Sequence, residues 1–290
     1  MKLTAEEFLN QQHKAITLLG MSGVGKTTLS NKLDRSRWFH YSGDYRIGTK
    51  YLEEPILDNI KAKAMRIDFL ADLLRSDSIY ICNNITVNNL EPVSTFLGKL
   101  GDEQLDGLSL DEFKYRQQLH CQAEIFAMLD VPAFMDKAVN IYGYPNFLND
   151  AGGSLCELND EEVFETLSEN SLILYIRADE EHEETLCQRA ISHPKPLYFQ
   201  EQFLDRHLAQ YLEENNLKQA DEMVPDEFSS WIFPKLLEHR KPLYESIAQK
   251  YGYTVDLHEI AQVRDEKDFM DLVCDAINRI TDKKIGRAHV

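Results

Sequence analysis

The pattern of apolar and polar positions predicts a chain in which short strands alternate with helices. Residues 15–19 and 172–176 form uninterrupted apolar, β-prone runs, as strands buried on both faces do. Weaker patterns predict further strands at 38–42, 78–82 and 253–257, and one between 139 and 149. Apolar residues at helical spacing predict helices at 4–12, 28–33, 55–74, 92–100, 109–129, 180–190, 200–214, 226–250 (interrupted near Pro234) and 266–280. This alternation predicts a parallel sheet covered by helices on both faces.

Residues 85–138 contain predicted helices and no clear strand. We interpret this segment as a helical insertion into the α/β core, so that residues 1–290 form a single domain. A chain of 290 residues has room for one large or two modest domains, and its 43% hydrophobic content is enough for a substantial core.

Composition narrows the class of partner. The chain carries 31 basic and 49 acidic residues, a net charge of −18. Such a surface repels nucleic acid and anionic membranes, so we expect neither as a partner. The five cysteines are scattered, which suits a reducing cytoplasm and supplies no zinc ligand set. No apolar run is long enough to span a bilayer. We therefore expect a cytoplasmic protein.

The strongest motif follows the first predicted strand, where residues 20–27 read Gly-Met-Ser-Gly-Val-Gly-Lys-Thr. They fit the phosphate-binding loop pattern of glycine, four residues, Gly-Lys and Ser/Thr. Glycines let backbone N–H groups turn toward phosphate oxygens. Lys26 is expected to reach the β- and γ-phosphates, and Thr27 to offer its hydroxyl to Mg²⁺. The predicted nucleotide-binding residues are Gly20, Ser22, Gly23, Val24, Gly25, Lys26, Thr27 and Thr28.

Two other predicted strands end in residues that suit phosphoryl transfer, and ligands of such folds bind beyond the carboxyl ends of the strands. After 38–42, Asp44 is placed to accept a proton from an attacking hydroxyl or to hold Mg²⁺ through water, and Arg46 to bind an anionic substrate. A turn capped by Asp44 is the simpler alternative. In the next such segment, Asp150 is a candidate metal ligand, and Gly152 and Gly153 allow close approach of backbone to substrate.

A lid is predicted after the strand at 172–176. The helix at 180–190 carries Arg189 near its end, and a proline-rich segment with Lys195 follows. Closing such a segment brings cations onto a transferring phosphoryl group and excludes water. Arg189 is the first candidate for this role, followed by Lys195 and Arg206; solvated surface cations are the alternative.

Two further signals are set aside. Residues 31–34 spell Asn-Lys-Leu-Asp, the guanine-reading tetrad of GTPases, but they lie directly after the phosphate loop instead of several strands later. We therefore expect ATP as the nucleotide. His120 and Glu124 are one helical turn apart, but no third metal ligand is apparent, so we expect an ordinary polar helix face.

The phosphate loop, the lid-like segment and residues 239–248 resemble the small-molecule kinases of the nucleoside-monophosphate-kinase-like group, and most of all shikimate kinase. His239-Arg240-Lys241-Pro242-Leu243-Tyr244 is similar to that family's Arg-x-Pro-Leu-Tyr helix, and Lys195-Pro196-Leu197 to its lid Arg-Pro-Leu. The resemblance implies a P-loop NTPase α/β/α fold with a five-stranded parallel sheet of order 2-3-1-4-5. It also implies that Arg240 binds a substrate carboxylate. Ser42 and Ser154 depart from the family's aspartate and glycine.

These observations favour a phosphotransferase that moves the γ-phosphoryl group of Mg·ATP to a small hydroxyl- or phosphate-bearing metabolite. The alternative is a P-loop ATPase or nucleotide-dependent switch that docks a protein partner through the 85–138 insertion. A kinase or repair enzyme acting on nucleic acid is opposed by the net charge.

Overall fold

The computed structural model describes residues 3–287, with side chains as far as residue 280. The chain divides into two compact units, which are described separately. The first, here called the sheet unit, comprises the described residues up to Gly43, Met128–Ser192, and those from Phe233 onward. The second, the helical unit, comprises Asp44–Ala127 and His193–Ile232. Helices α3, α7 and α12 contribute residues to both.

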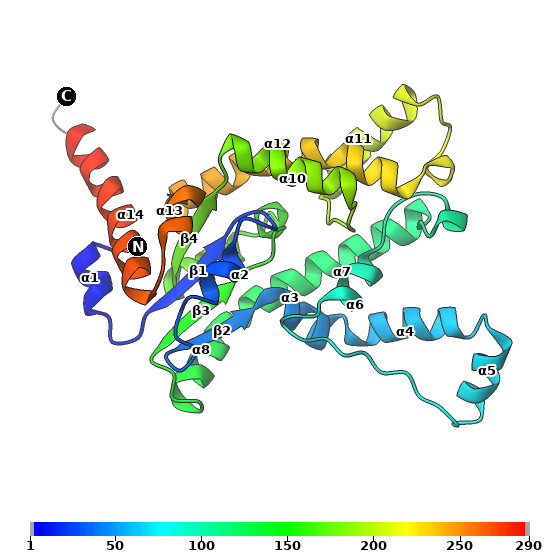
Figure 1. Ribbon diagram of the computed structural model, residues 1–290, viewed down its shortest axis with the longest axis horizontal. Helices are drawn as coiled ribbons and strands as arrows, with labels where there is room; N and C mark the ends of the chain where they lie inside the picture. The colour runs from blue at the N-terminus through cyan, green and yellow to red at the C-terminus, as the bar shows by residue number, and fades with distance from the viewer. Residues whose placement is uncertain (1–2, 288–290) are drawn as a thin grey trace. The chain divides into compact units, whose positions relative to one another are not determined.

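The sheet unit contains five parallel strands in the order β2-β3-β1-β4-β5. The strands are β1 (Ala15–Leu19), β2 (Trp38–Ser42), β3 (Asn146–Asp150), β4 (Leu172–Arg177) and β5 (Gly252–Asp256) (Figure 1). All five residues of β1 are buried, as expected of a central strand with helices on both faces. The register pairs Leu18 and Ser42 with Asp150, so the carboxyl ends of β1, β2 and β3 lie at one edge.

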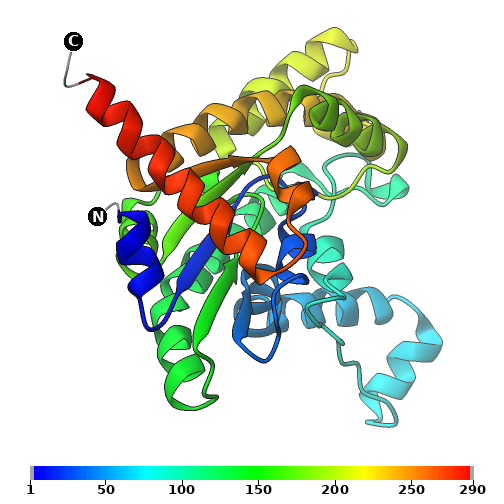
Figure 2. The same ribbon diagram turned by 60° about the vertical axis from the view of Figure 1, so that its left-hand side comes forward.

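Helices cover both faces of this sheet. Helices α1 and α14 pack against each other on one face, while α8, α9 and the second half of α12 cover the other (Figure 2). The helices of the sheet unit are α1 (Ala5–Asn10), α2 (Lys26–Ser30), α8 (Val131–Asn140), η3 (Leu155–Glu157), α9 (Glu161–Asn170), α10 (Glu180–Ser192), α13 (Leu257–Gln262), α14 (Glu266–Arg287) and the later part of α12 (Pro225–Tyr251). With the glycine-rich loop after central strand β1, this three-layer α/β/α arrangement is a P-loop NTPase fold.

The described residues of the helical unit form helices and irregular segments, without a strand. Its elements are α3 (Gly43–Arg46), η1 (Ile47–Tyr51), α4 (Glu53–Ala64), α5 (Asp68–Arg75), α6 (Glu91–Leu97), η2 (Glu103–Leu105), α7 (Leu110–Leu129), α11 (Glu201–Glu214), η4 (Ala220–Glu222) and the beginning of α12. The prediction of one domain with an insertion at 85–138 stays a prediction.

The fold class and the implied strand order are confirmed. The strand predicted at 78–82 is wrong: this segment follows α5 without pairing to a strand, and Tyr80 is 84% exposed. The interruption near Pro234 is also wrong. Helix α12 continues through Pro234 and Pro242, because the loss of one N–H at a proline is outweighed by apolar residues buried on both sides of it, among them Ile232 and Leu236.

Helix α2 is shorter than the sequence suggests, since it ends at Ser30. Residues 139 and 140 end helix α8, residues 141 and 142 form the turn after it, and β3 begins at Asn146. Of the described residues, no helix has the length and apolar character required to cross a membrane.

Candidate functional site

The loop joining β1 to α2 has a conformation that depends on its glycines. Gly23 and Gly25 have φ values of +92° and +86°, in the left-handed region that side-chain-bearing residues rarely adopt. A Cβ atom on Gly20 would come within 2.9 Å of the carbonyl oxygen of Ile176 on β4. The loop is therefore held in a tight turn at the carboxyl end of the central strand, where a phosphate-binding loop is expected.

Lys26 begins α2, and its side chain folds back over this loop. Its ammonium Nζ donates to the carbonyl oxygens of Gly20 at 2.6 Å and Met21 at 3.2 Å, and the residue is only 8% exposed. A buried cation that is bonded to two loop carbonyls concentrates positive charge inside the turn. In a chain of net charge −18, this is the local concentration of positive charge that a polyphosphate requires.

Thr27 and Asp150 are brought together from adjacent elements of the sheet unit. The Thr27 hydroxyl donates to Oδ2 of Asp150 at 3.0 Å, and Asp150 ends β3, the neighbour of β1. Hydroxyl and carboxylate oxygens are hard donors of the kind that Mg²⁺ binds, usually with water completing its coordination. The pair therefore fits that ion. The described residues contain no group of three or more His, Cys, Asp or Glu side chains that would form an all-protein metal site.

Gly153 packs directly on the phosphate loop. A Cβ atom at this position would lie 2.8 Å from the backbone nitrogen of Ser22. The carbonyl oxygen of Gly153 accepts hydrogen bonds from Nη1 of Arg240 at 2.8 Å and from the Tyr244 hydroxyl at 2.7 Å. Helix α12 thus holds the Gly152–Gly153 segment against the loop through two side chains one helical turn apart.

Arg240 is occupied by an internal carboxylate. Its Nε and Nη2 donate to Oε2 of Glu157 at 2.7 and 2.5 Å, and Arg240 and Glu157 are 3% and 2% exposed. Burial alone would lower the pKa of Arg240, but the negative charge of Glu157 raises it above its ordinary value, so the guanidinium remains charged. The substrate-carboxylate role implied by the resemblance does not fit this geometry, because Glu157 already supplies the carboxylate.

Helix α10 contacts the phosphate loop. The side chain of Leu186 lies 2.9 Å from the position of a Cβ on Gly23, and Nε2 of His182 lies 3.3 Å from the carbonyl oxygen of Gly23. Arg189 follows Leu186 by three residues and His182 by seven, which places it on the same face of α10. Its side chain is exposed. The sequence thus placed Arg189 on the helix that borders the loop.

The remaining predicted site residues belong to the helical unit. Asp44 and Arg46 lie in α3 and are half-buried, and the guanidinium of Arg46 lies 5.6 Å from the centre of the Tyr51 ring. Lys195 lies in an irregular exposed segment and Arg206 on the exposed face of α11. Their roles stay predictions.

The two signals set aside have structural explanations. Lys32, inside the Asn-Lys-Leu-Asp sequence, donates its Nζ to the carbonyl oxygen of Val263 at 2.6 Å. Nδ1 of His120 lies 3.9 Å from Oε2 of Glu124. The two residues are 7% and 0% exposed, so the expectation of an ordinary polar helix face is wrong. Helix α7 buries them within the helical unit, where His120 stacks on Tyr198.

Sequence reasoning missed three residues linked to the loop, Glu157, Tyr244 and His182, and it also missed His40. Tyr244 lies in the helix that the resemblance identified, so its signal was available. Glu157 and His182 stand in acidic stretches without a motif. His40 lies on β2, and burial lowers its pKa, with Arg35 adding to this effect and Asp150 opposing it.

Comparisons with known proteins show no family for this chain. No model of a protein family matches the chain, and no curated protein matches it. The crystal structure of shikimate kinase from Bacteroides thetaiotaomicron is similar at 14% identity, covering 78% of this chain and 98% of that chain, with a TM-score of 0.28. Because the TM-score is so low, the fold assignment rests on the chain's own strand order and loop geometry.

Proposed function

We propose that the chain is a phosphotransferase that moves the γ-phosphoryl group of Mg·ATP to a small hydroxyl- or phosphate-bearing molecule. The observation that carries the proposal is the glycine-rich turn after β1, with buried Lys26 inside it and Thr27 bonded to Asp150 beside it. These are the parts that position and neutralise a triphosphate.

In this proposal, the turn at 20–25 binds the phosphates through backbone N–H groups. Lys26 exchanges its contacts with the Gly20 and Met21 carbonyls for phosphate oxygens. Thr27 and Asp150 hold Mg²⁺, which when bound supplies further positive charge to the phosphates. Arg189, on the face of α10 that borders the loop, stabilises the transferring group, with Lys195 in the same role.

Asp44 and Arg46 are the residues that we assign to the acceptor. An oxygen of the acceptor bonds to the γ-phosphorus, the bond from that phosphorus to the bridging oxygen of ADP breaks, and a hydroxyl acceptor gives its proton to Asp44. Arg46 binds an anionic group of the acceptor. Gly152 and Gly153 provide backbone atoms for substrate binding. Arg240 acts through Gly153, since it is bonded to that carbonyl.

The test is ADP release from Mg·ATP, measured with and without a panel of small hydroxyl-bearing and phosphorylated metabolites. The proposal expects release to rise strongly with one class of acceptor and to be abolished in Lys26→Ala. Lys267→Ala is the matched control, because Lys267 is exposed and pairs with Asp271 on its own helix. Turnover that is unchanged in Lys26→Ala contradicts the proposal.

The alternative is a nucleotide-dependent ATPase or switch that docks a protein partner. It is favoured by apolar side chains on the helical unit, where Ile67, Phe69 and Tyr80 are 54%, 71% and 84% exposed. These residues precede the predicted insertion at 85–138. Slow ADP release that no metabolite accelerates would support this alternative over the kinase.

A further inference from the structure

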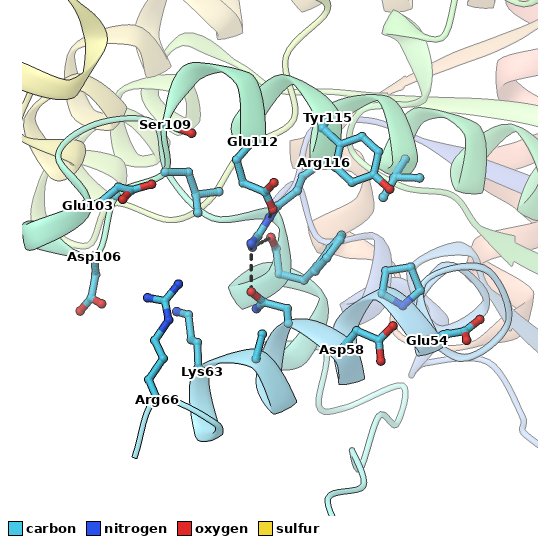
Figure 3. A pocket seen from close by; sticks show the side chains of 17 residues that line it. Glu54, Asp58, Lys63, Arg66, Glu103, Asp106, Ser109, Glu112, Tyr115 and Arg116 are labelled. Carbon is cyan, nitrogen blue, oxygen red and sulfur yellow. Dashed lines mark hydrogen bonds and ion pairs between the residues drawn. The ribbon is translucent and has the colours of Figure 1, made fainter. Parts of the chain in front are cut away.

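The helical unit contains a cleft of about 790 Å³, here called the α4–α7 cleft. Helix α4 and Arg66 form one wall, and the 103–109 segment and the first turns of α7 form the other (Figure 3). Phe96 of α6 also lines the cleft. This volume is within the range of small-molecule sites. Every residue that lines the cleft belongs to the helical unit.

The cleft has a fixed floor built around Arg116 of α7. This residue is 6% exposed, and its Nη2 donates to Oδ1 of Asn59 on α4 at 2.9 Å, which ties the two walls together. Its Nε and Nη1 donate to Glu112 and to the carbonyl oxygen of Phe96, both at 2.6 Å. These three bonds use three of the five guanidinium N–H groups. The floor is therefore held in place by hydrogen bonds, and two guanidinium N–H groups of Arg116 remain as possible donors.

The wall opposite α4 is also rigid. The backbone N–H groups of Leu105 and Gly107 donate to the carbonyl oxygen of Asp102 at 3.0 and 2.9 Å, and Leu108 N–H donates to the carbonyl oxygen of Lys99 at 2.8 Å. Asp106 has a left-handed φ of +61° inside this turn. The turn fixes the position from which the Asp106 side chain extends at the edge of the cleft.

Charges of opposite sign face each other across the opening. Figure 3 shows the side chains of Lys63 and Arg66 side by side, on the opposite side of the opening from Glu103 and Asp106. Among the described residues, none of these four side chains forms an ion pair or a hydrogen bond with another side chain. These charged side chains do not pair with each other across the cleft. They can therefore pair with groups of opposite charge, or with polar groups, on a bound molecule.

We propose that the α4–α7 cleft binds a small anionic molecule rich in hydrogen-bond donors. Lys63 and Arg66 hold its phosphate or carboxylate group, and Glu103 and Asp106 accept hydrogen bonds from its hydroxyl or amino groups. Phosphate and carboxylate present the same chemistry to paired cations. The site is built from the helical unit alone, so it does not depend on the proposed phosphotransferase activity.

The test is calorimetric titration of the full chain with three probes: glucose 6-phosphate, glucuronate and uncharged glucose. The first two distinguish a phosphate from a carboxylate, and glucose shows what the hydroxyl groups contribute alone. Since the phosphate loop is a second place for phosphate, each titration is repeated with a non-hydrolysable Mg·ATP analogue present.

Two double variants decide the outcome. Lys63→Gln with Arg66→Gln removes both cations from the cleft. Lys50→Gln with Arg75→Gln removes the same charge from exposed positions of the helical unit outside the cleft. The proposal expects a charged probe to bind the native chain and the control variant with the same affinity. It expects the affinity of the Lys63/Arg66 variant for that probe to be lower by about tenfold or more. It is overturned if neither charged probe binds better than glucose, or if the two variants bind alike.

Discussion

The Thr27 hydroxyl donates a hydrogen bond to Oδ2 of Asp150 at 3.0 Å, linking the first turn of α2 to the end of β3. The two residues are 123 positions apart in the chain, and the parallel pairing of β1 with β3 brings them together. The bond brings a hydroxyl and a carboxylate oxygen together at the end of the phosphate loop, which is why we place Mg²⁺ there.

Replacement of Thr27 by alanine is expected to raise the Mg²⁺ concentration needed for half-maximal ATP binding by about tenfold to a hundredfold, as for loss of an oriented ligand. Thr27→Ser keeps the hydroxyl and should stay near the native value. The measurement is calorimetric titration of ATP at a series of Mg²⁺ concentrations. Equal Mg²⁺ dependence in the alanine and serine variants would exclude the hydroxyl as a ligand.

Replacement of Glu157 by alanine leaves the buried Arg240 guanidinium without its carboxylate. We expect the free energy of unfolding to fall by about 3–5 kcal/mol, the usual cost of an uncompensated buried charge. Urea denaturation measures this change. Lys267→Ala, which removes one partner of an exposed pair, should change stability by less than about 1 kcal/mol. A Glu157→Ala variant as stable as this control would mean that the pair is not buried as described.

Replacement of Gly153 by alanine forces a methyl group to within 2.8 Å of the Ser22 backbone nitrogen. Because the nearest atom is backbone and cannot turn aside as a flexible side chain could, the phosphate loop must shift, and we expect ATP affinity to fall by about tenfold or more. Gly143→Asn is the matched control, since no atom lies within 4 Å of that position and asparagine tolerates its left-handed backbone. Unchanged ATP affinity in Gly153→Ala would contradict the close packing of Gly153 on the Ser22 backbone.

Acidification is expected to destabilise the sheet unit through His40. Its pKa is lowered by burial and by Arg35, so the folded chain resists a proton that the unfolded chain accepts below about pH 6.5. This contribution to stability is complete above that pH and is lost as the pH falls through the folded pKa. Urea midpoints at pH 7.5 and 5.5 should differ less in His40→Gln than in the native chain. The same substitution at exposed His258 should leave the difference between the two urea midpoints as it is in the native chain. A difference in His40→Gln equal to that of the native chain would contradict the role given to His40.

The sequence predicted the parts of this molecule that depend on local pattern. Residues 15–19 and 172–176 are apolar throughout because they are interior strands, and the loop at 20–27 has a motif because phosphate binding requires glycines at set positions. The nearness of Thr27 and Asp150 could also be predicted, since both lie at the carboxyl ends of strands in one parallel sheet.

Other parts depended on contacts that no local pattern encodes. The carboxylate that satisfies Arg240 comes from Glu157, 83 residues away, and nothing near Glu157 marks it as a buried partner. The apolar run at 78–82 resembles a strand, but a strand also needs a partner with which to pair. Helix α12 tolerates Pro234 because of packing along its whole length, which is a tertiary effect.

The central claim is that backbone and side chains of the turn at 20–27 bind a triphosphate, and calorimetry with a non-hydrolysable Mg·ATP analogue tests it directly. We expect saturable binding of one equivalent to the native chain and a large loss of affinity in Lys26→Ala. Absence of heat from the native chain at millimolar analogue, with the fold intact by circular dichroism, would contradict the account.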